Sequence, residues 1–168
     1  MERTIWIDKA YAVCQKRRFS LSTFFTACGI FDLTADAHAS PRNFMCTALV
    51  MAAKLHEYYA YPGLMCKLFY MQTEEMFKIE RQVLVMLDWK LHLNTIFTGF
   101  QDVTTTVPVE FCVELVRRAP HGSYDVMDTV TQFLNGAGDC SVSKRPPRPL
   151  QSPPPTAKAR TARNSDRA

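Results

Sequence analysis

Residues 44–55 decide the fold of this chain, and they read Phe44-Met45-Cys46-Thr47-Ala48-Leu49-Val50-Met51-Ala52-Ala53-Lys54-Leu55. The run is apolar at almost every position. It follows Ser40-Pro41, a helix cap and a proline that suits the first helical position. A helix that is apolar all round is stable only when other helices surround it. The run therefore predicts the central helix of a bundle.

Seven other segments carry helical signals, and we find no convincing strand-type alternation of apolar and polar residues. They span residues 5–17, 20–34, 64–70, 73–87, 95–102, 108–118 and 123–134. The segment that starts at Thr73 places Met76, Ile79 and Val83 on one apolar stripe. These patterns predict an all-α fold.

The charge of the chain is unevenly distributed. Residues 141–168 hold seven basic residues against one acidic residue, a net charge of +6 within a chain total of +4. Residues 1–140 therefore carry a net charge of −2. The last 28 residues also hold six of the ten prolines and no aromatic residue, which predicts a disordered tail. A nucleic-acid-binding fold needs its basic patch on structured elements, so the charge makes nucleic acid an unlikely partner.

Membrane and secreted classes are also disfavoured. The longest run without a charged residue, Phe19–Phe31, has 13 residues, whereas a membrane-spanning helix needs roughly 18–20. No apolar signal-peptide core follows Met1-Glu2-Arg3. Five cysteines lie in apolar stretches and are interpreted as reduced core residues of an intracellular protein: Cys14, Cys28, Cys46, Cys66 and Cys112.

The sequence carries no recognisable catalytic or metal-binding motif. It has no glycine-rich phosphate loop and no Cys-x-x-Cys or His-Glu-x-x-His spacing. Glu74 and Glu75 are adjacent, so they point to different sides of a helix and are interpreted as partners of its dipole. We therefore expect a non-enzyme with no cofactor, no metal and no small-molecule ligand.

Two charged residues interrupt apolar helix faces. Lys54 closes the central helix, and Glu80 lies between Ile79 and Val83 in the helix that starts at Thr73. One interpretation is that Lys54 extends to solvent and Glu80 pairs with a basic neighbour on its own helix, Lys78 or Arg81. The other is that both charges contact a partner.

Several segments resemble the cyclin box in the correct order over residues 3–100. Ala52-Ala53-Lys54-Leu55-His56-Glu57 is similar to the Ala-Ser-Lys-Phe-Glu-Glu end of its third helix. Residues 76–84 are similar to its fifth helix, where a glutamate precedes a Val-Leu pair, and residues 87–91 to the exit from that helix. Arg3-Thr4-Ile5-Trp6-Ile7-Asp8 resembles the Arg-x-Ile-Leu-x-Asp opening of the first helix.

The resemblance implies a five-helix bundle around a buried third helix, over residues 1–94. It also implies a partial second helical repeat over 95–140, before the tail at 141–168. The family binds and activates cyclin-dependent protein kinases in cell-cycle control, by holding the kinase's C-helix inward. For this chain the resemblance implies that the kinase-binding residues are Lys54, Glu80 and Glu57. It also implies that the protein acts in the nucleus, the cytoplasm or both. If the central helix continues past His56, Glu57 shares a side of it with Lys54.

The family's groove for substrate peptides is degenerate in this chain. Its positions correspond to Arg3, Ile5, Trp6 and Lys9, and Lys9 stands where the family has a tryptophan. A hydrated ammonium in an apolar groove disfavours peptides of the arginine-x-leucine type, unless Trp6 refills the groove.

The sequence leaves three candidate functions open. The first is a kinase-activating subunit, and the second is an interaction protein that occupies a kinase without activating it. The third is a transcription-factor-like, DNA-binding form of the same bundle, which the net charge of −2 on residues 1–140 disfavours.

We expect the tail from Ser141 to be dispensable for folding, because its composition cannot bury enough apolar surface to offset its ordering entropy. Deletion of residues 141–168 should leave the circular dichroism spectrum and the melting temperature nearly unchanged. A loss of several degrees would contradict this prediction.

Overall fold

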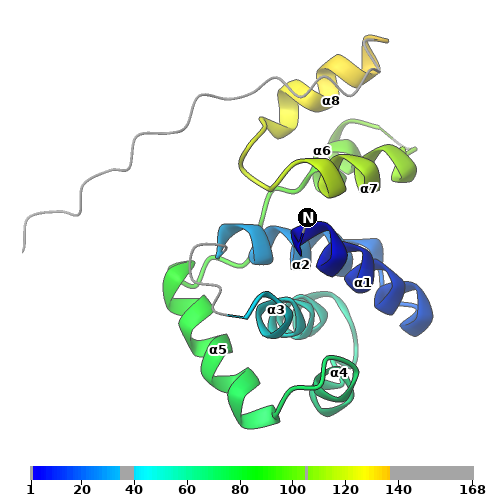
Figure 1. Cartoon of the computed structure of the whole chain (residues 1–168). Coiled ribbons are helices and arrows are strands. Elements are labelled where there is room, and N and C mark those ends of the chain that lie inside the picture. The colour runs from blue at the N-terminus through cyan, green and yellow to red at the C-terminus, as the bar shows by residue number, and fades with distance from the viewer. Residues whose placement is uncertain (1, 35–39, 105, 137–168) are drawn as a thin grey trace, which may run out of the picture.

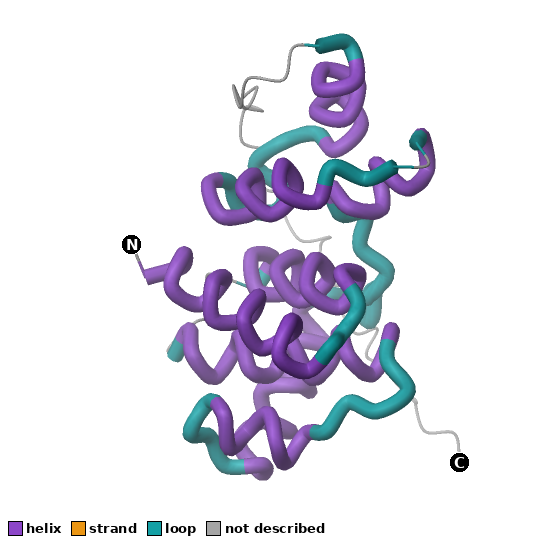
Figure 2. The backbone as a smooth tube through the Cα atoms, turned by 90° about the vertical axis from the view of Figure 1, so that its right-hand side faces the viewer, coloured by secondary structure: helices purple, strands orange, loops and turns teal. Residues whose placement is uncertain are grey.

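The computed structural model describes residues 2–34, 40–104 and 106–136. Helices make up all of its regular secondary structure over these ranges (Figures 1 and 2). They are α1 (Glu2–Arg17), α2 (Leu21–Leu33), α3 (Pro41–His56), α4 (Pro62–Leu68), α5 (Thr73–Met86), α6 (Ile96–Val103), α7 (Val109–Arg118) and α8 (Val126–Leu134). The all-α prediction is confirmed.

The third helix is the centre of the bundle, as its apolar run predicts. Every residue of α3 from Asn43 to Ala53 is buried, and exposure begins only at Lys54. Figure 1 shows α3 nearly end-on, with α1, α2, α4 and α5 arranged around it. The helix has Pro41 in its first turn, where the missing N–H costs no helical hydrogen bond.

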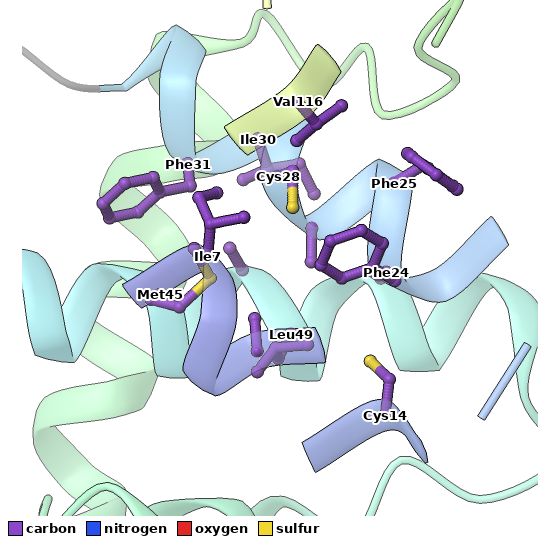
Figure 3. Close-up of a cluster of buried hydrophobic side chains, with 14 of the residues drawn as sticks. Ile7, Cys14, Phe24, Phe25, Cys28, Ile30, Phe31, Met45, Leu49 and Val116 are labelled. Carbon is purple, nitrogen blue, oxygen red and sulfur yellow. The ribbon is translucent and has the colours of Figure 1, made fainter. Parts of the chain in front are cut away.

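The core lies where α1, α2 and α3 meet (Figure 3). Ile7 of α1, Phe24 of α2 and Leu49 of α3 are all 0 % exposed. Burial of each such side chain contributes about 1.5–3 kcal/mol relative to leaving it in water. These three helices therefore form the centre of the core.

The five cysteines interpreted as core residues are buried, and none forms a disulfide. Burial raises the pKa of the Cys14 thiol to about 12, and the charge of Glu57 adds to this effect. Burial likewise raises the pKa of Cys112 to about 12. These thiols are protonated at neutral pH and pack as small apolar groups.

Several helix starts differ from the sequence prediction, and the first helix begins at Glu2 and not at Ile5. The fourth helix begins at Pro62 and not at Leu64, because a proline is well tolerated in a first turn. The fifth helix begins at Thr73, and its N-cap residue is Gln72. The last helix begins at Val126 and not at Ser123, since the Asp125 side chain accepts a hydrogen bond from the Asp128 backbone N–H and caps it.

Three helices, α6 to α8, follow the bundle, with α6 packed on α2 and α7 packed on α1. Close approach of α8 to α6 depends on Gly99, where a Cβ atom would lie 2.5 Å from Cγ1 of Val126. Aromatic rings of Phe100, Phe111 and Phe133 fill the space among the three helices. The division at residues 94 and 140 stays a prediction, and the tail at 141–168 lies outside the described residues.

A buried ion pair ties these two groups of helices together. The Arg3 guanidinium on α1 donates from Nε and Nη2 to the two carboxylate oxygens of Asp32 on α2, at 2.7 and 2.8 Å. The same guanidinium donates to the backbone carbonyls of Arg117 and Ala119, at 3.1 and 3.3 Å. The backbone N–H of His121 completes the network by donating to Asp32 at 2.7 Å. One side-chain pair therefore joins α1, α2 and the end of α7.

We expect Arg3→Ala to destabilise the protein by about 3–5 kcal/mol, because it leaves a carboxylate that is 2 % exposed without its counter-charge. Urea unfolding followed by circular dichroism measures the change. Arg118→Ala is the control, since that arginine forms an exposed pair with Glu114 and should cost under about 1 kcal/mol. Equal losses in the two variants would contradict a structural role for the Arg3–Asp32 pair.

Candidate functional site

The two charges singled out by the sequence meet in space. Nζ of Lys54, at the end of α3, lies 2.5 Å from Oε1 of Glu80 on α5. The side chain of Lys54 is 41 % exposed, and that of Glu80 is 15 % exposed. The interpretation that pairs Glu80 with Lys78 or Arg81 is therefore wrong, because its ion-pair partner comes from another helix.

Apolar side chains surround this pair on the surface. The Lys54 ammonium lies 5.7 Å from the centre of the Phe77 ring, and Phe77 is 43 % exposed. Leu84, one helical turn beyond Glu80, is half-buried. We call Lys54, Phe77, Glu80 and Leu84 the α3–α5 surface. It combines one ammonium, one carboxylate and exposed apolar area, which is the composition of a protein-binding surface more than of a catalytic one.

The two residues that follow Leu55 contact α2 instead. The helix ends at His56, and Glu57 has extended backbone angles, so Glu57 does not continue the face that carries Lys54. Nε2 of His56 lies 2.9 Å from the Thr26 hydroxyl. The Glu57 carboxylate accepts hydrogen bonds from the Ser20 N–H at 2.7 Å, from the Ser20 hydroxyl at 2.8 Å and from the Thr23 hydroxyl.

These contacts shift the pKa values of both residues. Burial lowers the pKa of His56 and outweighs the opposing charge of Glu57, so the neutral ring is favoured at physiological pH. Burial raises the pKa of Glu57, but the hydrogen bonds from Thr23 and Ser20 outweigh it and leave the pKa below its ordinary value of 4.5. Both residues therefore connect the end of α3 to the start of α2.

The four residues of the degenerate docking patch do not all lie together in the structure. Arg3 turns inward to Asp32 and is part of the buried ion pair, while Ile5 is 58 % exposed. Trp6 and Lys9 remain together on α1, where the Lys9 ammonium lies 5.4 Å from the centre of the Trp6 ring. Sequence reasoning missed the second half of this cluster, which comes from Phe69 and Tyr70 after α4.

Metal-ligating residues do not gather in the described part of the chain. No three His, Cys, Asp or Glu side chains there are placed to hold a metal ion. Nor does any helix in these ranges have the length and apolar character to cross a membrane.

The helices pack as a bundle around one buried helix, with a charged pair at the exposed end of that helix, so the protein belongs to the class of all-α helical bundles. Residues 1–92 match the family model described as Cyclin, N-terminal domain. The chain therefore belongs to the cyclin family, whose members are regulatory proteins. Searches of curated proteins and of solved structures returned no match.

We expect Glu57→Gln to cost about 1 kcal/mol of stability at pH 7, because it weakens the capping of α2. The pKa of Glu57 is lowered on folding, so its stabilisation is present above about pH 4.5 and lost as the pH falls through the folded value. The difference between wild type and variant should therefore shrink below pH 4.5.

Chemical unfolding at a series of pH values checks this expectation. Asp102→Asn is the control, because Asp102 is an exposed carboxylate outside this network and its loss should change stability little at any pH. A Glu57→Gln effect that does not vary with pH would contradict the assignment.

Proposed function

We propose that this chain is a regulatory subunit that binds and activates a cyclin-dependent protein kinase through the α3–α5 surface, and so acts in cell-cycle control. The observation that carries the proposal is the pairing of Lys54 with Glu80 on adjacent helices, within 2.5 Å. Membership of the cyclin family supports a kinase as the partner.

The pair is suited to recognise the backbone of a partner. A lysine ammonium has three donors, and Glu80 engages only one of them. Oε2 of Glu80 accepts no hydrogen bond from the side chains that the structure describes, so an acceptor is also available. A partner segment that exposes carbonyl and N–H groups at a helix end would find both complements on this surface.

The intramolecular ion pair itself contributes little to stability. A pair exposed to this degree is worth about 0–1 kcal/mol, so folding does not explain why these charges interrupt apolar helix faces. When a partner covers the pair, its charge-assisted hydrogen bonds strengthen because water is excluded. Phe77 and Leu84 supply the apolar contacts that exclude this water.

The contributions of the other residues follow from their contacts. Glu57 already accepts three hydrogen bonds from Ser20 and Thr23, so its expected contact with the kinase stays a prediction.

The second candidate function is a subunit that occupies the kinase without activating it. Assay of kinase activity in the captured complex distinguishes the two functions.

We expect Lys54→Glu and Glu80→Lys each to weaken kinase binding roughly ten- to a hundredfold, equivalent to about 1.4–2.8 kcal/mol. Each single variant places two side chains of the same charge at positions 54 and 80. It also replaces a donor with an acceptor, or an acceptor with a donor, opposite the partner's backbone groups. Calorimetry with a panel of cyclin-dependent kinases measures affinity, and circular dichroism verifies folding.

The double variant, Lys54→Glu with Glu80→Lys, separates partner binding from folding. It restores an intramolecular ion pair but presents it to the partner with inverted charge. Stability should return to near the wild-type value while kinase binding stays weak. The control is the same exchange at Glu114 and Arg118, an exposed pair on α7. Recovery of wild-type affinity in the double variant at Lys54 and Glu80 would contradict the proposal.

A further inference from the structure

Three consecutive cations lie at the end of α1. Lys16 and Arg18 are exposed, Arg17 is half-buried, and none of them forms an ion pair with a side chain that the structure describes. Nε of Arg17 is buried and makes no hydrogen bond to the described residues. Cations at this end of a helix complement its dipole, but that role uses none of the five donors that each guanidinium carries. We call these three residues the 16–18 cluster.

The backbone holds Arg18 in a conformation that favours glycine. Its φ is 57°, in the left-handed region. The Arg18 N–H donates to the carbonyl of Gln15 at 3.2 Å, and the Phe19 N–H donates to that of Cys14 at 2.9 Å, so this turn ends the helix. A glycine would form the same turn without steric cost. The turn therefore carries an arginine side chain at a position where folding alone favours glycine.

An exposed run of tyrosines lies beside this turn. The Ser20 N–H donates to the Glu57 carboxylate at 2.7 Å, which joins the turn after α1 to the loop at 57–61 that leaves α3 (Figure 1). Tyr58 in that loop is 90 % exposed, and its hydroxyl makes no hydrogen bond to the described residues. Its ring stands edge-on to that of Tyr59, with ring centres 4.5 Å apart. The neighbouring ring therefore supports Tyr58 while its hydroxyl stays accessible.

The turn and the loop together are positively charged. Residues 15–20 and 57–61 hold three cations and one carboxylate, that of Glu57, a net charge of +2. The Glu57 carboxylate already accepts three hydrogen bonds from Ser20 and Thr23. The elements on either side add no negative charge, because the first turn of α2 and the whole of α4 contain no acidic residue. An accessible phenol therefore stands next to an excess of unpaired cations.

We infer that Tyr58 is a site of phosphorylation by a protein tyrosine kinase, and that the 16–18 cluster holds the phosphate once it is attached. In the transfer, the Tyr58 hydroxyl oxygen bonds to the γ-phosphorus of ATP. The bond from that phosphorus to the bridging oxygen breaks, ADP leaves, and the phenolic proton passes to the base of the tyrosine kinase. The phosphate brings about 1.5–2 negative charges and three acceptor oxygens, which guanidinium groups bind bidentately. The modification therefore ties the loop at 57–61 to the turn after α1.

The geometry of the tyrosines favours this site over a nucleic-acid surface. Cations beside aromatic rings also occur where proteins bind single-stranded nucleic acid, with successive bases stacked on the rings. Here the planes of Tyr58 and Tyr59 are 88° apart, and those of Tyr59 and Tyr61 are 42° apart. These rings form no common stacking platform, so a phosphate attached to Tyr58 suits the cluster better than the phosphates of a nucleic acid.

The first test asks whether the hydroxyl is a substrate. The full chain is incubated with ATP and a recombinant tyrosine kinase of broad specificity, and mass spectrometry locates the phosphate. Tyr58 should be modified, as should the reference residue Tyr70, which is 82 % exposed. Tyr124, 4 % exposed, should stay unmodified. Phosphate on Tyr70 but not on Tyr58 would overturn the inference.

The second test asks whether the cluster holds the phosphate. Phosphotyrosine incorporated at position 58 of the full chain should raise the melting temperature by about 2–4 °C, because it adds charge-assisted hydrogen bonds between two segments. Phosphorus NMR should show that the second pKa of the phosphate lies below its ordinary value of about 6, since nearby guanidinium groups favour the dianion. Both effects should weaken with added salt.

Variants locate the cations that act on the phosphate, with each phosphorylated variant compared with its own unmodified form. Arg18→Gln should reduce both effects of the phosphate. Arg17→Gln repeats the test at a residue inside the helix. Arg81→Gln is the matched control, because it removes an exposed arginine from α5 and should leave both effects unchanged.

Two results would contradict the role of the cluster. Equal effects of the phosphate in the wild type, Arg17→Gln and Arg18→Gln would show that the cluster does not hold it. Binding of a single-stranded oligonucleotide by the unmodified chain, lost in Arg18→Gln, would identify nucleic acid as the ligand instead. None of these measurements uses a cyclin-dependent kinase, so their outcome is independent of the proposed function.

Discussion

Burial of α3 on all sides is the constraint on which the rest of the structure depends. Eleven consecutive residues of this helix, Asn43 to Ala53, are buried, so neighbouring helices must cover every face of it. Only the ends of such a helix reach water. A charged residue of this helix can reach a binding partner only from one end of the helix, and Lys54 lies in its last turn. The position of the α3–α5 surface follows from the apolar run that precedes it.

The helices around this centre are joined at their ends by charged side chains. Arg3 and Asp32 join α1, α2 and the end of α7, while Glu57 joins the end of α3 to the start of α2. Each of these carboxylates accepts several hydrogen bonds, which offsets the cost of removing its charge from water. Apolar packing alone permits helices to slide and rotate, whereas these directional bonds specify one arrangement. The exposed pair at Lys54 and Glu80 lacks such additional bonds and remains available to a partner.

The sequence predicted the fold well because helix formation leaves a local signal. The apolar run at 44–55, the cap before Pro41 and the acidic first turn of α5 are each visible within a few residues. The site was only partly predictable, since side-chain direction depends on where a helix ends and on what packs beside it. The helix stops one residue before Glu57, which turns that carboxylate toward α2. Arg3 was assigned to a surface patch, but Asp32, 29 residues away, draws it inward.

Two cations illustrate how the same residue type acquires different roles. Lys54 has a carboxylate partner on the neighbouring helix, so its charge is balanced before any partner binds. Lys9 is held by aromatic rings, which fix its position but leave its charge unbalanced. In Figure 1, α1, which carries Lys9, and α5, which carries Glu80, lie on opposite sides of α3. A balanced pair suits recognition of backbone donors and acceptors together.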